Sequence, residues 1–225
     1  MQAVILAAGR GLRLRPLTDT CPKALVDLGG KPLLERLLEA LPKEIHEIII
    51  VVGYLHEQIE SYVGHEWNGR SVKYVLQNPL DGTGSALTAC RDLLSDRFLV
   101  INGDDLYLNG DLSRLIGHPL GILVSATQDV VAASVLCDTQ NHFEGLETNP
   151  PQGEEHLRVC GAYVLDTRFF HQPLATIRVH GKTEYSLPHT LIGMTKDCVI
   201  TVERAQHWKP VGTPEELEKA RLWIK

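Results

Sequence analysis

The sequence of 225 residues predicts an α/β fold, with a mostly parallel central sheet, helices on both faces and a smaller antiparallel β insertion. Through the first 105 residues, short apolar runs rich in β-branched residues alternate with amphipathic helical patterns. Such alternation favours parallel strands joined by crossover helices. Beyond that point the strand patterns lie closer together and are separated by turn-forming stretches at 138–141 and 149–153, which favours antiparallel pairing.

The strands are predicted from short apolar runs. The runs 3–6 and 48–52 are too short for helices and are continuously apolar, which is typical of strands buried on both faces. Further strands are expected at 72–76, 98–101, 121–126, 131–136, 159–165 and 198–202.

The helices are predicted between and after these strands. Segment 32–41 places its leucines on one face, with Pro32 at a first-turn position. Segments 56–63 and 84–94 have similar patterns, and the last helix, 213–224, begins with Thr213 as its cap, followed by Pro214 and two glutamates. Because the chain contains no internal repeat and no long linker, we expect a single domain over residues 1–225.

Composition excludes several classes of protein. The net charge of −6 argues against a protein that binds nucleic-acid backbone, because phosphate neutralisation needs an excess of Lys and Arg. The longest apolar stretch, 48–55, is far too short to span a membrane. The five cysteines contain no Cys-x-x-Cys pair and fit a reducing compartment. No basic region precedes the apolar residues 3–8, so we expect no signal peptide and a cytoplasmic location.

The most informative segment is the glycine-rich loop after the first strand, where α/β sheets place ligand loops. Gly9 and Gly11 let main-chain N–H groups approach anionic oxygens. Four cationic side chains occupy fourteen residues of this region: Arg10, Arg13, Arg15 and Lys23. A glycine-rich turn with solvated arginines is the simpler interpretation, but the position and the cationic cluster together favour an anion-binding loop.

Two other glycine motifs are excluded by single positions. A dinucleotide fingerprint needs a third glycine where the chain has Leu14. A P-loop needs Gly-Lys followed by Ser or Thr, with a glycine five residues before that pair. The pair at 30–31 is followed by Pro32, and the pair at 181–182 lacks the earlier glycine, because position 176 is Thr176.

Residues 6–18 (LAAGRGLRLRPLT), followed by Pro22-Lys23, resemble the signature of the sugar-phosphate nucleotidylyltransferases. These enzymes join a nucleoside triphosphate to a sugar 1-phosphate and release pyrophosphate. The resemblance is strongest over 1–110 and 207–217, and it implies a Rossmann-like fold. It implies a nucleotide-binding half at 1–110, a sugar-side half with the β insertion at 111–205 and a C-terminal helix region at 206–225. Its loop residues would bind nucleotide or act as catalytic cations: Leu6, Ala8, Gly9 and Gly11 for the nucleotide, Arg13 and Lys23 for catalysis.

A second patch indicates the base. Gln77 lies at a predicted strand end, five residues before Gly82 and Thr83. A Gln amide offers a donor and an acceptor together, which matches a pyrimidine edge. In uridylyl- and thymidylyl-transferring members a Gln and a Gly at this spacing read the base, whereas guanylyl-transferring relatives usually carry another residue at the Gln position. The resemblance therefore implies a pyrimidine nucleotide, with UTP, dTTP and CTP all left open.

A third patch indicates a metal. Strand 98–101 runs into the sequence NGDD, and carboxylates at such a strand end commonly bind hard cations. The resemblance implies Asp104 as the Mg²⁺ ligand, with Asp105 as a second candidate or as a cap for the next segment. The family's late motif carries a metal-binding acid where this chain has Pro210. Either Mg²⁺ relies on Asp104, water and phosphates, or Asp105 or Glu203 compensates, or catalysis is impaired.

The sugar side departs furthest from the family. Alignment gives Glu147, Gly161, Tyr163 and Glu184 as sugar-binding residues, but a lysine and an asparagine of the family motifs are missing. The expected partners are a nucleoside triphosphate and a sugar 1-phosphate, without nucleic acid or membrane and with homo-oligomers left open. A phosphocholine or inositol phosphate acceptor, or a non-catalytic regulator that binds nucleotide, are the alternatives.

Overall fold

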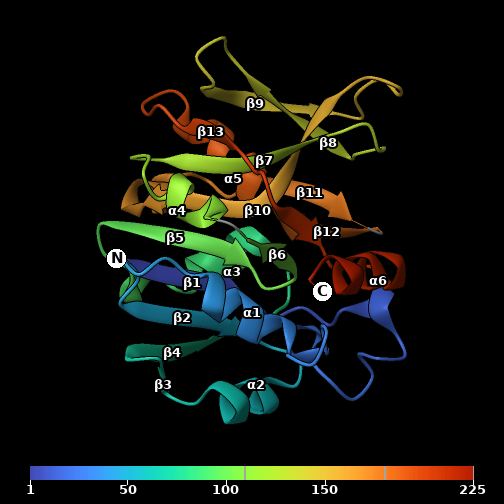
Figure 1. Ribbon diagram of the computed structural model, residues 1–225. Helices are drawn as coiled ribbons and strands as arrows, with labels where there is room; N and C mark the ends of the chain where they lie inside the picture. Colours follow the sequence, from blue (N-terminus) through green and yellow to red (C-terminus); the bar gives the residue numbers. More distant parts are fainter. Residues whose placement is uncertain (109, 180, 225) are drawn as a thin grey trace.

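The computed structural model describes residues 1–108, 110–179 and 181–224, and its centre is an eight-stranded sheet (Figure 1). In order across the sheet, the strands are β13 (Thr201–Arg204), β7 (Gly121–Thr127), β10 (His156–Asp166), β5 (Arg97–Asn102), β1 (Gln2–Leu6), β2 (Glu47–Val52), β4 (Arg70–Leu76) and β3 (Glu66–Trp67). β10 is antiparallel to both of its neighbours and β3 is antiparallel to β4, while the other pairs are parallel. The predicted mostly parallel sheet is confirmed.

The register of the central strands brings several loops to one edge. Leu6, the last residue of β1, lies opposite Val51 in β2 and Asn102 in β5. The main chain continues this alignment past the strands, because the Gly103 N–H donates to the Leu6 carbonyl at 2.9 Å. The loops after β1, β4 and β5 therefore begin side by side at the carboxyl edge, where sheets of this type place ligands.

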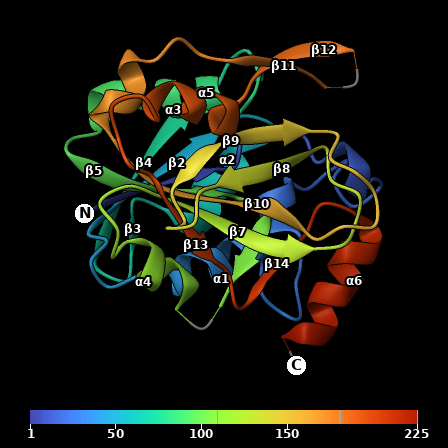
Figure 2. The ribbon, with the colours of Figure 1, turned by 90° about the horizontal axis from the view of Figure 1, so that it is seen from above.

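Helices cover both faces of the sheet, as predicted. They are α1 (Leu33–Ala40), α2 (His56–Val63), α3 (Thr83–Thr88), α4 (Asp111–Leu115), α5 (Leu187–Met194) and α6 (Pro214–Trp223). Figure 2 shows α1 and α4 on one side of the strands and α3 and α5 on the other. Alternate residues of β1 explain the two layers: Ile5 packs in the core with α1, α2 and α4, and Val4 packs in the core with α3 and α5. Among the described residues, no helix combines the length and apolar character needed to cross a membrane.

A third apolar cluster joins the two ends of the described chain. Leu14 of the glycine-rich loop packs with Leu33, Leu106, Val211 and the α6 residue Leu217 in this cluster. The predicted cap of α6 is present, because the Thr213 hydroxyl accepts a hydrogen bond from the Glu216 N–H at 3.2 Å. The C-terminal helix thus anchors the loop that follows β1.

Three small antiparallel sheets complete the fold. They pair β8 (Ala133–Cys137) with β9 (Phe143–Thr148), β11 (Thr176–Val179) with β12 (Lys182–Tyr185), and β6 (Asp105–Tyr107) with β14 (Trp208–Pro210). The predicted antiparallel insertion is confirmed in the β8–β9 hairpin, whose turn at 138–141 is closed by Asp138 accepting from the Gln140 and His142 N–H groups. Figure 2 shows the β11–β12 hairpin and α6 at the same end of the sheet, on opposite sides of it.

Several predicted boundaries are wrong for local reasons. The helix expected at 84–94 divides into α3 and a 3₁₀ turn at Arg91–Leu93, because the Cys90 N–H already bonds to the Leu87 carbonyl, three residues back instead of four. The strand expected at 198–202 begins at Thr201, since the Cys198 N–H still bonds to Met194 at the end of α5. Short elements without a strong apolar pattern were not predicted: β3, β6, α4, β9, β11, β12, α5 and β14.

Candidate active site

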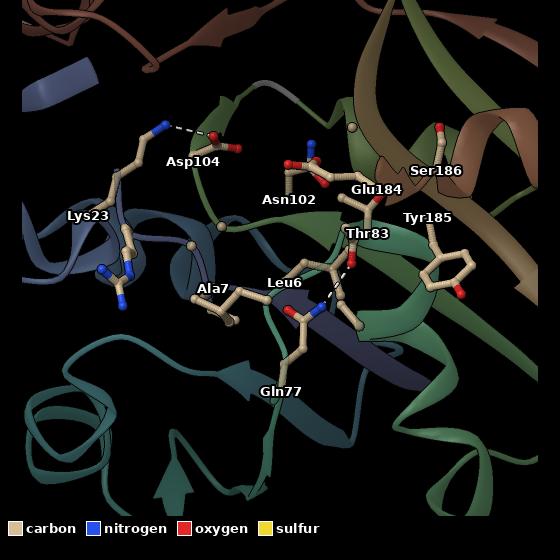
Figure 3. Close-up of a pocket in the computed structure, with 18 of the residues that line it drawn as sticks. Leu6, Ala7, Lys23, Gln77, Thr83, Asn102, Asp104, Glu184, Tyr185 and Ser186 are labelled. Carbon is tan, nitrogen blue, oxygen red and sulfur yellow. Dashed lines mark hydrogen bonds and ion pairs between the residues drawn. The ribbon is translucent and has the colours of Figure 1, made fainter. Parts of the chain in front are cut away.

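A cavity of about 640 Å³ opens at the carboxyl edge of the sheet. Its walls come from the loop after β1, the loop between β4 and α3, the end of β5, the irregular middle of β10 and the β11–β12 hairpin (Figure 3). Most of the predicted site residues line it: Leu6, Ala8, Gly9, Gly11, Lys23, Gln77, Gly82, Thr83, Asp104, Gly161, Tyr163 and Glu184. Segments that lie far apart in the sequence are therefore brought together as expected.

The glycine-rich loop is held in one conformation against Lys23. Gly11 has a φ of 62°, which L side chains rarely adopt, and a β-carbon there would lie 2.9 Å from the Lys23 β-carbon. The Thr18 hydroxyl donates to the Gly11 carbonyl at 2.8 Å and fixes the loop from its far side. Only 11% of the Lys23 side chain is exposed, so its stem is packed and its ammonium group has a defined position.

That ammonium group points at the carboxylate of Asp104 at the cavity wall. The Lys23 Nζ lies 2.6 Å from the Asp104 Oδ2, and Figure 3 shows the two side chains pointing toward one another. The Asp104 side chain is 39% exposed, and its carbonyl accepts from the Val211 N–H at 3.0 Å. The pair presents a cation for a phosphate and an anion for a metal at one place.

Asp105 points elsewhere. It is buried in β6 opposite Pro210 of β14, and its carboxylate packs against the backbone of Gly161 without lining the cavity. Burial, reinforced by the negative charge of Asp104, raises the pKa of Asp105 well above its ordinary value. Because Asp104 lines the cavity and Asp105 does not, the geometry favours Asp104 as the cation-binding residue.

Glu203 is also occupied. It belongs to β13, where its carboxylate binds Arg114 at 3.1 Å and His118 at 2.9 Å, and it does not line the cavity. Pro210 does lie beside the Asp104–Asp105 segment, as the alignment expected, but its side chain carries no ligand atom. Over the described ranges, no group of three or more His, Cys, Asp or Glu residues could hold a metal ion.

The loop after β4 forms a polar pocket around Gln77. The Gln77 Nε2 donates to the Gly82 carbonyl and to the Ser85 hydroxyl, both at 2.9 Å. Gln77 is buried, and its amide oxygen accepts no hydrogen bond from any described residue. That oxygen is therefore an acceptor left for a ligand. Gly82 has a φ of 116° and lies so close to the Tyr185 backbone that a β-carbon would collide with it.

The opposite wall was predicted less completely. The β11–β12 hairpin and the residue that follows it line the cavity with the predicted Glu184 and with four residues that were not assigned: Ile177, Lys182, Tyr185 and Ser186. The alternation of polar and apolar residues at 176–179, followed by Gly181, was the available sequence signal for this hairpin. Three more lining residues belong to motifs whose other members were assigned: Arg10, Asn102 and Gly103.

Tyr163 lines the cavity from β10. Burial raises the pKa of Tyr163, so its phenol stays a neutral hydrogen-bonding group.

Two further predicted residues, besides Asp105 and Glu203, lie outside the cavity. Arg13 is exposed, and its guanidinium lies against Gly212, where a β-carbon would be 2.7 Å from its Nη2. Arg10 is the arginine that lines the cavity in this conformation, with its guanidinium 5.7 Å from the Tyr54 ring centroid. Glu147 is exposed in β9 opposite Ser134, and nothing in this geometry brings it to the cavity.

Curated proteins similar to this chain include GlmU and AglF relatives. The chain is 30% identical to bifunctional protein GlmU from Methanococcus aeolicus, covering 100% of this chain and 54% of that protein. It is 28% identical to UTP–glucose-1-phosphate uridylyltransferase AglF from Haloferax volcanii, covering 98% of this chain and 95% of that protein. The chain thus spans about half the length of the GlmU relatives, 54% in two of them.

Solved structures show the same fold. A UTP-bound UGPase from Acinetobacter baumannii superposes with a TM-score of 0.80 at 22% identity, covering 99% of this chain and 92% of that chain. HddC from Yersinia pseudotuberculosis gives a TM-score of 0.75 at 26% identity, covering 100% of this chain and 99% of that one. Residues 2–119 match the family model described as nucleotidyl transferase. The resemblance found in the glycine-rich loop is confirmed, and the chain belongs to the sugar-phosphate nucleotidyltransferase family.

Proposed function

We propose that this chain transfers a nucleotidyl group from a pyrimidine nucleoside triphosphate to a sugar 1-phosphate, forming a nucleoside diphosphate sugar and pyrophosphate. The observation that carries the proposal is the Lys23–Asp104 pair, 2.6 Å apart at the wall of the cavity. The Gln77 pocket and the Glu184 hairpin line the same cavity and adjoin one another at Gly82 and Tyr185. A triphosphate and a second phosphate both need cationic contacts in one space, and this cavity supplies them.

The reaction needs little covalent chemistry from the protein. A phosphate oxygen of the acceptor forms a bond to the α-phosphorus of the nucleotide. The bond from that phosphorus to its bridging oxygen breaks, and the electron pair leaves with pyrophosphate. Because the acceptor phosphate is already anionic, no general base is required. The barrier falls through positioning and through cationic charge placed around the transferring group.

Residues from the N-terminal half of the chain have separate roles in this reaction. The main-chain N–H groups of the loop at 9–11 hold the triphosphate. Lys23 neutralises the α-phosphate and the incoming phosphate, and Asp104 keeps its ammonium group at the cavity wall. Arg13 holds the departing pyrophosphate, which requires its exposed guanidinium to turn from Gly212 toward the cavity.

Magnesium is the cofactor we propose, with Asp104 as its protein ligand. The donor set fits this ion, because Mg²⁺ is commonly bound through one or two carboxylates together with substrate phosphates and water. The half-exposed Asp104 carboxylate faces the cavity, and Asn102 lines the cavity beside it. When bound, the ion would spread positive charge over the reacting phosphates.

The free acceptor oxygen of Gln77 supports a uracil or thymine base. Both bases carry a donor at N3–H, whereas cytosine has an acceptor at N3 and a donor only at its N4 amino group, so a contact of this oxygen at N3 favours UTP or dTTP over CTP. AglF, which is named as a UTP-dependent enzyme, supports the same choice. A guanylyl transfer is the second candidate, since a heptose 1-phosphate guanylyltransferase from Aneurinibacillus thermoaerophilus is 37% identical over 110 residues.

A matrix assay tests the proposal. Pyrophosphate release is measured for UTP, dTTP, CTP and GTP against a panel of sugar 1-phosphates, phosphocholine and inositol phosphate, with Mg²⁺. We expect release with UTP or dTTP and a sugar 1-phosphate, and loss of release when Mg²⁺ is replaced by EDTA. Release only with GTP would overturn the base assignment, and release only with phosphocholine or inositol phosphate would overturn the acceptor. Tight triphosphate binding without release from any pair would identify a regulator instead.

A further inference from the structure

Lys182 is the cation of the cavity wall that faces the glycine-rich loop. In the described part of the chain, three cationic side chains line the cavity: Arg10, Lys23 and Lys182. Arg10 and Lys23 both belong to the N-terminal segment, whereas Lys182 begins β12 in the second half of the chain. Figure 3 shows the same division for labelled residues, with Lys23 on one side and Glu184, Tyr185 and Ser186 on the other.

The charge of Lys182 is not used inside the protein. Lys23 is bound to Asp104, and Arg10 lies over the Tyr54 ring. Lys182 makes no ion pair within 4.0 Å with any residue that the structure describes, and it lies in an exposed position at the cavity wall. An unpaired ammonium group at a cavity wall is suited to bind an anionic group of a ligand.

The stereochemistry of nucleotidyl transfer indicates which anionic group Lys182 binds. In-line displacement places the attacking oxygen and the departing pyrophosphate on opposite sides of the α-phosphorus. The N-terminal loop binds the triphosphate in the function proposed above, so the attacking phosphate enters from the hairpin side. We propose that Lys182 binds the phosphate monoester of the acceptor. This inference rests on the proposed function and names the residue that gives the acceptor side its positive charge.

Hydrogen bonds attach the C-terminal end of the hairpin to the nucleotide side of the cavity. The Tyr185 N–H at the end of β12 donates to the Asp81 carbonyl at 2.7 Å, and the Leu187 N–H at the start of α5 donates to the Thr83 hydroxyl at 3.1 Å. Glu184 stands two residues from Lys182 on the same strand and lines the same cavity. One short strand thus offers a cation for a phosphate and a carboxylate for hydroxyl groups.

Steady-state kinetics of Lys182→Ala test the assignment with the nucleotide and acceptor that the matrix assay identifies. Loss of one charge-assisted contact should raise the KM for the acceptor about 10- to 100-fold, with the KM for the nucleotide unchanged. Lys182→Arg should recover part of the loss. Arg178→Ala is the matched control, because Arg178 is an exposed cation of the same hairpin that does not line the cavity. Inorganic phosphate should inhibit the wild type competitively with the acceptor, and Lys182→Ala more weakly.

The outcomes separate this inference from the proposed function. An unchanged acceptor KM in Lys182→Ala, or equal increases in both KM values, would overturn the role of Lys182 while the transferase remained established. If the wild type releases no pyrophosphate with any pair, the proposed function is wrong, and calorimetry with glucose 1-phosphate then decides the role of Lys182. A Kd raised at least about 10-fold by Lys182→Ala supports it. Equal Kd values, or no binding by the wild type, overturn it.

Discussion

The two walls of the cavity are built by different means. The nucleotide wall consists of loops that leave parallel strands, and main-chain hydrogen bonds such as Gly103 to Leu6 fix their positions. The acceptor wall consists of the irregular middle of β10 and the β11–β12 hairpin, a two-stranded sheet separate from the central one. Polar side chains line both walls. Because the hairpin is not part of the central sheet, we expect its side chains to change more readily, and acceptor specificity to reside there.

The walls also differ in how firmly they are held. The interior residues of β1 and β5 are all buried, and Leu14 packs the adjoining loop against α6. The strands β11 and β12 contain no fully buried residue. Hydrogen exchange should therefore be faster in the hairpin than in β1, because opening it exposes little apolar surface. We therefore expect substitutions in the nucleotide wall to lower turnover strongly, and substitutions elsewhere to have smaller and more selective effects.

Lys23→Ala should have the largest effect. Removal of one preorganised charge contact to the transferring phosphate should lower kcat by about 10²- to 10³-fold. Asp104 would also lose the partner that lies 2.6 Å away. Lys31→Ala is the control, because Lys31 pairs with Glu35 and Glu39 on the surface, outside the cavity. Turnover close to that of the wild type in Lys23→Ala would remove the central assignment.

Arg13→Ala comes next and is compared with Arg10→Ala. If Arg13 turns into the cavity to hold pyrophosphate, its loss should lower kcat by about 10²-fold, at the lower end for a preorganised contact because its guanidinium is exposed in this conformation. Arg10→Ala changes an arginine of the same loop that already lines the cavity. A larger loss in Arg10→Ala than in Arg13→Ala would transfer the pyrophosphate contact to Arg10.

Gln77→Leu should change base selectivity more than turnover. Loss of a neutral hydrogen bond to the base should lower kcat/KM for UTP by about tenfold and leave the value for CTP nearly unchanged. Leu cannot replace the hydrogen bonds from Nε2 to Gly82 and Ser85, so the activity of the variant is measured at a temperature at which both proteins are folded. Gln140→Leu, in the exposed turn of the β8–β9 hairpin, is the control. An unchanged ratio between the two nucleotides would contradict the proposed base contact.

The same contrast explains what the sequence could predict. The nucleotide wall follows from short contiguous motifs, because Gly9, Gly11 and Lys23 lie near one another in the chain and parallel strands bring Gln77 and Asp104 to the same edge. The strands and helices with strong apolar patterns could also be predicted, because these patterns are local in the sequence. Arg13 was placed in the right loop, but the direction of its exposed side chain depends on contacts with Gly212, which no local pattern encodes.

The acceptor wall could be predicted only in part. Glu147 was aligned through a stretch without matching motifs, and the structure places this stretch in β9, none of whose residues line the cavity. Lys182 was not assigned because strands of four residues carry too little apolar periodicity to locate a hairpin. Tertiary pairing, which these residues do not encode locally, places Lys182 at the cavity.

Thr213→Ala should have the smallest effect and should fall on the nucleotide side. Removal of the hydroxyl that caps α6 should lower the free energy of unfolding by about 1 kcal/mol, measured with urea. Leu217 of α6 packs in the same cluster as Leu14, so a loosened helix end should weaken the loop after β1 and raise the nucleotide KM more than the acceptor KM. Thr148→Ala, an exposed threonine of β9, should leave both quantities within the experimental error. If Thr213→Ala raised the acceptor KM more than the nucleotide KM, α6 would support the acceptor wall, and the separation of the two walls would have to be abandoned.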